Sequence, residues 1–336
     1  MLNEKVNETL KKTDFSGTVL LRAESDTVYS GASGYANRSD RLRINLETRF
    51  GIASGCKLFT AIAICQLVEK GDLTLQTRLN SCLDFDFPHF DDAITVHHLL
   101  THTSGVPDYF DEEVMDDFEE LWQQTPMYAL RNLEGFLTLF QNEKMKFTPG
   151  SRFHYNNAGF VLLGLIVEKI SGQVFSDYVE QHIFKKAAME ESGYFSFDQL
   201  PTNTALGYIE KEDGTWKTNV YSLPVKGGAD GGAFTTVLDM IKCWDALFYN
   251  QLLCKEMTET LLSPHRSVDE ENSYGYGVWI TRKNDQIYKY HVMGYDPGVS
   301  FHSSYYPNSK HTLVVASNKS TGAYEVVEVI EEQLKE

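Results

Sequence analysis

The sequence predicts an α/β (α+β) fold, in which an antiparallel sheet built from both ends of the chain is interrupted by a helical insertion. Strand-like runs with turn signals lie near the N-terminus, and four more lie near the C-terminus. Residues from about 72 to 200 show helical and loop patterns without alternating strands. Because connections avoid crossing, we expect the two sets of strands to meet in one sheet.

The N-terminal part begins with a predicted hairpin, in which SGTVLLRA and TVYSGASGYA flank a polar turn at residues 24–26. The segment FGIASGCK then leads into a helix. From Leu58 to Val68 only Thr60 and Gln66 are polar, so this helix is apolar on all sides and should run through the core.

Helices are predicted through the middle of the chain, and strands return near its end. HHLLTHTSG predicts a short helix, DEEVMDDFEELW predicts an acidic helical stretch, and another helix runs from about Asn157 to Ile170. After GGADGGAFTT come the helix VLDMIKCWDALF and four strand-like runs: YGYGVWITR, QIYKYHV, GVSFHSSYYP and HTLVVASN. The tail AYEVVEVIEEQLKE predicts an amphipathic helix.

Composition limits the function classes. The 336 residues are 42% hydrophobic and 23% charged, which excludes disordered, collagenous and disulfide-scaffold proteins. The formal net charge of −17 and the lack of a basic run argue against nucleic acid, because phosphate binding needs a basic surface. We expect a small-molecule or short-peptide substrate as partner, and the oligomeric state stays open.

The cysteines and the first residues indicate a location. Five cysteines are an odd number without metal-type spacing, which favours free thiols in a reducing compartment. Residues 1–12 form a short amphipathic pattern without the apolar core of a signal peptide. No stretch of about 18 uncharged apolar residues is present, so we expect no transmembrane segment and a cytoplasmic location.

Ser54 and Lys57 are the first candidates for chemistry. Their spacing places both side chains on one face at the start of the apolar helix. A serine hydroxyl needs a base before it becomes a good nucleophile, and a lysine at the mouth of an apolar helix is desolvated, which lowers its pKa. The N–H groups of the helix N-terminus can stabilise an oxyanion. A structural alternative stays open, in which Ser54 only caps the helix and Lys57 extends to the surface. The pattern S-x-x-K alone does not exclude it, because this pattern occurs by chance in most long proteins.

Tyr155, Asn157 and His291 are further candidates. A tyrosine near a lysine can exchange protons, and an asparagine beside it can hold a substrate amide. Taken alone, Asn156 or Asn157 is more simply the N-cap of the helix that follows, and Tyr155 a half-buried aromatic residue. His291, in KYHVMGYDPGVSF, can face a pocket and bind a carboxylate, although a lone histidine is more often structural.

Metal and phosphate sites are not expected. His97, His98 and His102 have helical spacing, but no carboxylate or cysteine is placed to complete a zinc set. The glycines of GGADGG do not connect a strand to a helix at nucleotide-binding spacing. We therefore expect no metal and no organic cofactor.

The order of these motifs resembles that of the β-lactamase-related serine hydrolases, most of all the class C β-lactamase, D-alanyl-D-alanine carboxypeptidase and family VIII esterase group. The resemblance is carried by FGIASGCKLFTAIAICQLVEKGDL, ITVHHLLTHTSGVPDY, FTPGSRFHYNNAGFVLLGLIVEKISG and GGADGGAFTTVLDMIKCWDAL. It runs from about residue 13 to 320. It implies a β-lactamase/transpeptidase-like fold, with a sheet domain from residues 1–70 and 200–336, a helical domain from 71–199, and the active site in the cleft between them.

The resemblance also implies roles. Ser54 would be acylated, Lys57 would assist its deprotonation, Tyr155 would move protons and activate water, and Asn157 would bind the substrate amide. The family's third motif is Lys or His, any residue, then Gly, and here the chain departs from it. Either His291 is kept and the strand bulges by one residue, or Gly294 is kept and Val292 replaces the histidine.

The leading hypothesis is therefore a serine hydrolase that acts on small esters or amides through an acyl-enzyme. A penicillin-binding D-alanyl-D-alanine peptidase or weak β-lactamase is the second, and the altered third motif weakens it because that motif binds the substrate carboxylate. A non-catalytic ligand-binding member of the family is the third.

Overall fold

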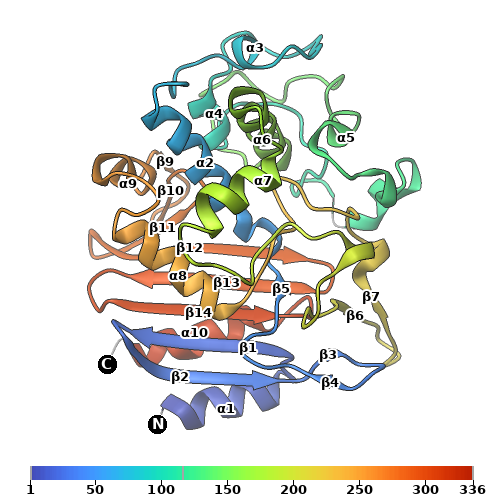
Figure 1. Ribbon diagram of the computed structural model, residues 1–336, viewed down its shortest axis with the longest axis vertical. Helices are drawn as coiled ribbons and strands as arrows, with labels where there is room; N and C mark the ends of the chain where they lie inside the picture. Colours follow the sequence, from blue (N-terminus) through green and yellow to red (C-terminus); the bar gives the residue numbers. More distant parts are fainter. Residues whose placement is uncertain (1, 116, 335–336) are drawn as a thin grey trace.

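An antiparallel sheet of eight strands forms the lower half of the protein in Figure 1, which shows the computed structural model over residues 2–115 and 117–334. The strand order is β2-β1-β14-β13-β12-β11-β10-β9, so the two N-terminal strands pair with the last strand of the chain. The strands are β1 (Gly17–Ala23), β2 (Asp26–Ser33), β9 (Arg266–Ser267), β10 (Asn272–Tyr274), β11 (Trp279–Lys283), β12 (Gln286–Asp296), β13 (Val299–Tyr306) and β14 (His311–Ser317). The expected sheet from both ends of the chain is confirmed.

The two terminal helices cover one face of the sheet. α1 (Leu2–Lys12) packs against α10 (Ala323–Leu334), and α10 packs against β13 and β14. Their apolar stripes meet alternate residues of the strands, such as Val19 and Val315, in a small separate core.

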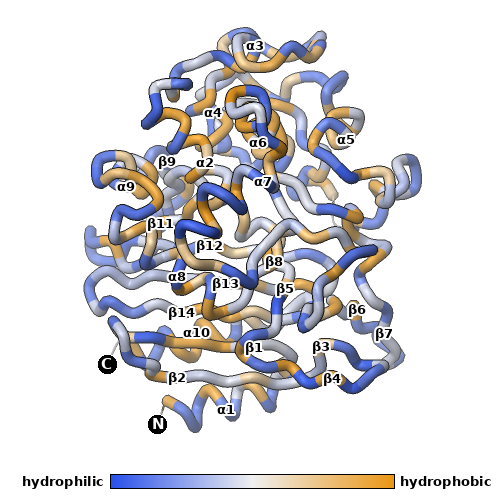
Figure 2. The backbone as a smooth tube through the Cα atoms, viewed as in Figure 1, coloured by the Kyte–Doolittle hydropathy of each residue, from blue (hydrophilic) through white to orange (hydrophobic). Residues whose placement is uncertain are grey.

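The other face carries the helical layer, which holds the larger core. α2 (Lys57–Glu69) crosses α6 (Asn157–Ser171), and hydrophobic residues gather along α6 in Figure 2. Every residue of α2 from Lys57 to Leu67 is buried, as expected for a helix that is apolar on all sides. The other helices are α3 (Leu79–Cys82), α4 (Val96–Leu100), α5 (Leu133–Leu137), α7 (Phe175–Val179), α8 (Val237–Phe248) and α9 (Lys255–Leu261).

Short strands connect the two layers beside the start of α2. β5 (Phe50–Gly51) pairs with β8 (Phe234–Thr235), which fixes the chain just before the predicted nucleophile. The remaining pairs are β3 (Tyr35–Asn37) with β4 (Leu42–Arg43), and β6 (Tyr208–Glu210) with β7 (Trp216–Thr218).

Two predicted elements are wrong. The acidic stretch 111–122 does not form an α-helix: the chain turns after Phe110, and only Phe118–Gln123 coils, as a 3-10 helix (Asp116 lies outside the described residues). Like charges at helical spacing disfavour the helix, and two of its carboxylates are drawn into ion pairs described below. The run YGYGVWITR is not one strand, because Gly277 (φ 66°) turns tightly against the backbone of Lys57.

No single helix among the described residues is long and apolar enough to cross a membrane. The bent pair Asn157–Ser171 and Phe175–Phe184 meets that test of length and composition only when its two helices are taken together.

Candidate active site

Ser54 lies in the tight turn that begins the core helix. Residues Ala53–Cys56 form a 3-10 turn that continues directly into α2, and the Ile52 N–H donates to the Ala233 carbonyl at 3.0 Å. Ala53 has a φ of 45°, a left-handed conformation that is strained for alanine and here immediately precedes the serine. The Gly55 N–H donates to the Ile52 carbonyl at 2.9 Å, and the Lys57 N–H donates to the Ser54 carbonyl, so the turn is closed by its own backbone.

Lys57 is enclosed by three polar partners. Its Nζ lies 2.9 Å from Ser54 Oγ, 2.7 Å from Asn157 Oδ1 and 2.7 Å from the Asp230 carbonyl O, and the residue is 1% exposed. An amide oxygen and a carbonyl oxygen can only accept hydrogen bonds, whereas a hydroxyl can donate or accept. Lys57 Nζ therefore donates to the oxygens of Asn157 and Asp230, and it lies within hydrogen-bond distance of the Ser54 hydroxyl, to or from which a proton can pass.

Tyr155 closes the other side of the serine. Its phenol hydrogen-bonds with the Ser54 side chain, and Lys57 Nζ lies 4.9 Å from the centre of its ring. Burial raises the pKa of Tyr155 well above its usual value of 10, so its resting form is the neutral phenol. The structure thus brings Ser54, Lys57, Tyr155 and Asn157 together.

Asn156 and Asn157 divide the two tasks that the sequence left open. The Asn156 side chain caps α6 by accepting the Gly159 N–H at 2.6 Å. This leaves the amide of Asn157 free to bind Lys57. Asp108 accepts the N–H groups of Asn157 and Ala158 at 2.8 and 3.0 Å, which holds the start of α6 in place.

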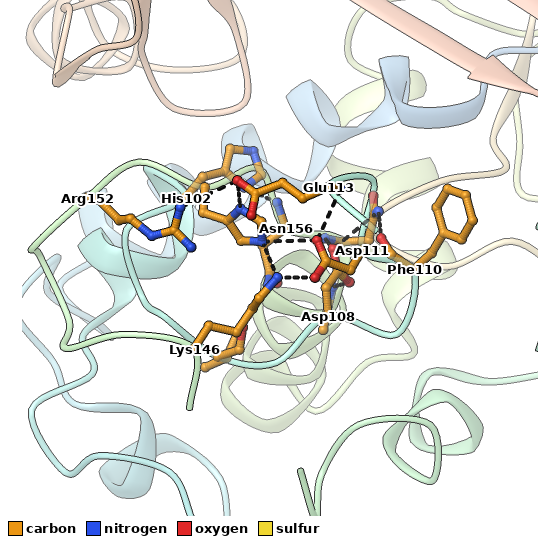
Figure 3. Close-up of polar contacts among 12 residues, drawn as sticks. His102, Asp108, Phe110, Asp111, Glu113, Lys146, Arg152 and Asn156 are labelled. Atoms are coloured by element: carbon orange, nitrogen blue, oxygen red, sulfur yellow. Dashed lines mark hydrogen bonds and ion pairs between the residues drawn. The ribbon is translucent and has the colours of Figure 1, made fainter. Parts of the chain in front are cut away.

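An ion-pair network holds the loops that carry Asp108 and Tyr155 (Figure 3). Lys146 contacts Asp111 and lies 2.8 Å from His154 Nε2, while Glu113 lies 3.0 Å from His154 Nδ1 and 3.4 Å from Arg152. Asp111, Glu113 and His154 come close enough to hold a metal ion. Two cations already balance their charges, so the group serves as a structural clamp on this side of the site.

The three histidines with metal-like spacing do not converge. His97 Nδ1 lies 2.8 Å from the Tyr276 hydroxyl, and His98 caps α4 through Thr95. His102 is buried, accepts the Asn156 N–H at 3.0 Å, and lies 4.4 Å from the ring of Tyr155. Burial keeps the pKa of His102 well below its usual value, so it is a neutral positioning residue behind the tyrosine.

The strand register favours the alignment of the third motif that keeps Gly294 and places Val292 where the family has its basic residue. β12 pairs with β13 in regular register from Tyr290 to Asp296, so the bulge required to keep His291 in the motif is absent. His291 turns away from the serine, where its Nε2 lies 3.2 Å from Thr281 Oγ1 and its ring stacks on His302. Val292, on the other face, packs in the core.

Gly294 lies directly against the serine turn. A Cβ at this position would be 2.1 Å from the Ile52 carbonyl O and 2.8 Å from the Ser54 N. Only glycine allows the strand and the turn to approach this closely. The backbone of Gly294 therefore lies at the site. Val292, two residues earlier, occupies the position at which the family motif has Lys or His.

We expect Gly294→Ala to lower kcat/KM for ester hydrolysis by about 100-fold, because the added methyl must push β12 and the Ser54 turn apart, and small displacements of reacting groups are costly. Steady-state kinetics with a thermal melt measures both effects. Gly135→Ala in α5 is the matched control, since its Cβ meets nothing closer than 3.4 Å. Equal activity of the two variants would contradict the close approach.

The cavity in front of Ser54 contains residues that the motif search did not single out. It has a volume of about 370 Å³, and its lining includes Tyr109, Glu112, Asp230 and Asp296. Asp230 lies in GGADGG, a segment that the resemblance includes without giving the aspartate a role, and Asp296 ends β12 just before the turn at Pro297 and Gly298. The sequence pattern that could have indicated these residues is an acidic residue beside glycines and next to a predicted site strand, where its side chain is accessible to a ligand.

Comparisons with known proteins agree with this geometry. The sequence model of the Beta-lactamase family matches residues 2–333. Penicillin-binding protein 4* of Bacillus subtilis is 30% identical over 331 residues, covering 93% of this chain and 70% of that protein. A penicillin-binding protein of Bacillus halodurans has a solved structure with 57% identity and a TM-score of 0.94, covering 98% of this chain and 99% of that one.

The D-amino acid amidase of Ochrobactrum anthropi, solved with D-phenylalanine, has a TM-score of 0.83 at 21% identity and covers 99% of both chains. At that identity the likeness concerns the fold alone. Together with the closer matches it confirms the β-lactamase/transpeptidase-like fold, whereas the division of the chain into two domains stays a prediction.

Proposed function

The chain belongs to the beta-lactamase family and is a serine hydrolase, and on that premise we propose that it cleaves small esters or amides through an acyl-enzyme on Ser54. The observation that carries the proposal is the cage around Lys57. Two of its three partners can only accept hydrogen bonds, and the third is the Ser54 hydroxyl. The contact places the Lys57 nitrogen where it can exchange a proton with the Ser54 hydroxyl, as a base for a serine nucleophile must.

Acylation begins when Ser54 Oγ bonds to the substrate carbonyl carbon while its proton passes to the Lys57 amine. The carbonyl electrons move to the oxygen, which the N–H groups at the start of the helix stabilise. The bond to the leaving group then breaks, and the neutral phenol of Tyr155 supplies the proton that this group needs. The Lys57 ammonium restores that proton to Tyr155.

Deacylation repeats these transfers with water in place of the alcohol or amine. Water gives a proton to the Tyr155–Lys57 pair as its oxygen attacks the acyl carbon, and the bond to Ser54 Oγ breaks. The proton returns to Ser54. One ester or amide and one water become one acid and one alcohol or amine, and the enzyme is regenerated.

The test is the partition of the acyl group between water and added methanol. If phenyl acetate and p-nitrophenyl acetate pass through one acyl-enzyme, both give the same ratio of methyl acetate to acetate, because the leaving group has already departed. Different ratios for the two esters would show that no common intermediate forms. Absence of turnover for every ester would favour the non-catalytic alternative.

A penicillin-binding peptidase is the second candidate, and the names of the relatives in Bacillus support it. Such an enzyme must bind the carboxylate of its substrate. The position that would carry the usual basic side chain holds Val292, which weakens this candidate relative to plain ester or amide hydrolysis.

The expected cytoplasmic location stays a prediction. All five cysteines are free thiols, four of them buried, which supports a reducing compartment.

A further inference from the structure

The cavity in front of Ser54 is acidic. Its lining carries four carboxylates, Glu112, Asp117, Asp230 and Asp296, and no lysine, arginine or histidine among the described residues. Lys57 lies behind it and bonds to the backbone carbonyl of Asp230, not to the carboxylate. In their ionised forms these acids attract cations and repel anions, and a narrow, partly apolar space strengthens both effects.

Asp230 places a buried, incompletely paired carboxylate in this cavity. The residue is 4% exposed, and its Oδ2 accepts the Tyr109 hydroxyl. Its Oδ1 has no hydrogen-bond partner among the described residues, although the N–H groups of Asp230 and Gly231 lie near the carboxylate. A buried acceptor without a donor is unfavourable, so this oxygen is prepared to receive a donor from a ligand.

Asp296 provides a second acceptor from the opposite layer. It is half-buried at the end of β12, directly before the turn to β13, and no hydrogen bond or ion pair joins its carboxylate to a described residue. Burial raises the pKa of Asp296 to about 7, with Asp230 and Glu112 opposing its ionisation and Lys57 favouring it. A bound cation would restore the ionised form.

Aromatic rings also line the cavity. Phe110 and Phe136 line the cavity from the helical layer, Phe234 lines it from β8, and Phe195 and Phe197 line it from the chain segment before that strand. The described pocket acids do not form a group of three with ligand atoms within 4.8 Å of one another, as a metal site requires. Dispersed carboxylates among aromatic rings suit an organic ammonium with an apolar substituent.

We propose that the acyl group of the substrate carries a positively charged amine beside an apolar side chain, so that amino-acid-type esters or amides with a free amino group are the substrate class. The amine donates to Asp230 and Asp296, and the side chain packs against the phenylalanines. This assignment rests on the proposed hydrolase function. It excludes substrates whose acyl group carries a carboxylate in the place of the amine.

Three methyl esters of the same shape test the proposal. Phenylalanine methyl ester, in both enantiomers, carries the amine; methyl 3-phenylpropanoate lacks it; and monomethyl benzylmalonate has a carboxylate instead. Titration of released acid should give kcat/KM at least about tenfold higher for one phenylalanine enantiomer than for the neutral ester, and lowest for the anionic ester. A preference for the neutral or anionic ester would overturn it.

Variants assign the effect to the two acids. Asp296→Asn and Asp230→Asn should each lower the ratio of kcat/KM for the cationic over the neutral ester by about tenfold or more. Glu270→Gln, which removes an exposed acid outside the cavity, should leave that ratio unchanged. An unchanged ratio in both aspartate variants would contradict the proposal.

The pH dependence follows from the same residues. In the wild type the ratio should rise as Asp296 ionises through about pH 7 and fall when the substrate amine loses its proton above about pH 8. Asp296→Asn should flatten the rising limb.

A binding measurement separates this proposal from the hydrolase mechanism. Titration calorimetry with Ser54→Ala should show tighter binding of phenylalanine amide than of 3-phenylpropanamide, whether or not any ester is turned over. If the wild type hydrolyses neutral esters through Ser54 but the two amides bind equally, the amine assignment fails and the hydrolase mechanism stands.

Discussion

Ser54→Ala should lower kcat/KM for p-nitrophenyl acetate by about 10⁴-fold or more, because it removes the hydroxyl that lies between Lys57 and Tyr155. The fold should survive. The substitution removes one hydroxyl from a site in which Lys57 keeps its bonds to Asn157 and Asp230. Stopped-flow and steady-state kinetics on the purified variant, together with a thermal melt, measure both parts of this expectation.

Ser81→Ala is the matched control, since it deletes an exposed hydroxyl of the helical layer outside the cavity. It should keep wild-type kinetics. If Ser54→Ala retained more than about a tenth of the activity with a normal melting temperature, a different nucleophile or direct attack by water would have to perform the reaction.

Lys57→Met should have the second large effect, a fall in kcat of about 10³-fold, because it deletes the base while keeping an unbranched side chain of similar length. It should also destabilise the protein. The Asn157 Oδ1 and the Asp230 carbonyl O would be buried without their donor, at about 1–3 kcal/mol each. Chemical denaturation measures this loss, and the pH profile of the residual kcat measures the chemical effect.

Lys70→Met removes an exposed lysine at the end of the same helix and should change neither quantity much. The outcome that counts against a base role for Lys57 is a variant that is destabilised but keeps its kcat, since a purely structural lysine would give that result.

Much of the fold follows from periodicity. Helix α2 was predictable because eleven consecutive positions contain only two polar residues, and the terminal strands were predictable from their β-branched runs and turns. The acidic stretch after Phe110 was not, because its conformation depends on Lys146 and Arg152, which lie more than thirty residues further along the chain. Local charge patterns contain no information about such distant partners.

The candidate site was predictable only where its contacts are local in the sequence. Ser54 and Lys57 meet because helical spacing brings them together, and this contact is local. That Asn157, and not Asn156, reaches Lys57 depends on which asparagine caps α6, and sequence alone left both possible. The third motif depends on strand register, in which a shift of one residue exchanges Val292 for His291 at the same face. The acids of the cavity meet only through tertiary folding.

The central claim, a covalent acyl-enzyme on Ser54, is tested most directly by the intact mass of the wild-type protein, quenched with acid during turnover of an ester with a large acyl group. The mechanism predicts a mass gain equal to that acyl group, located by peptide mapping on Ser54, that disappears as the substrate is consumed and is absent in Ser54→Ala. Full turnover with no adduct, or an adduct on another residue that turns over at the same rate, would contradict it.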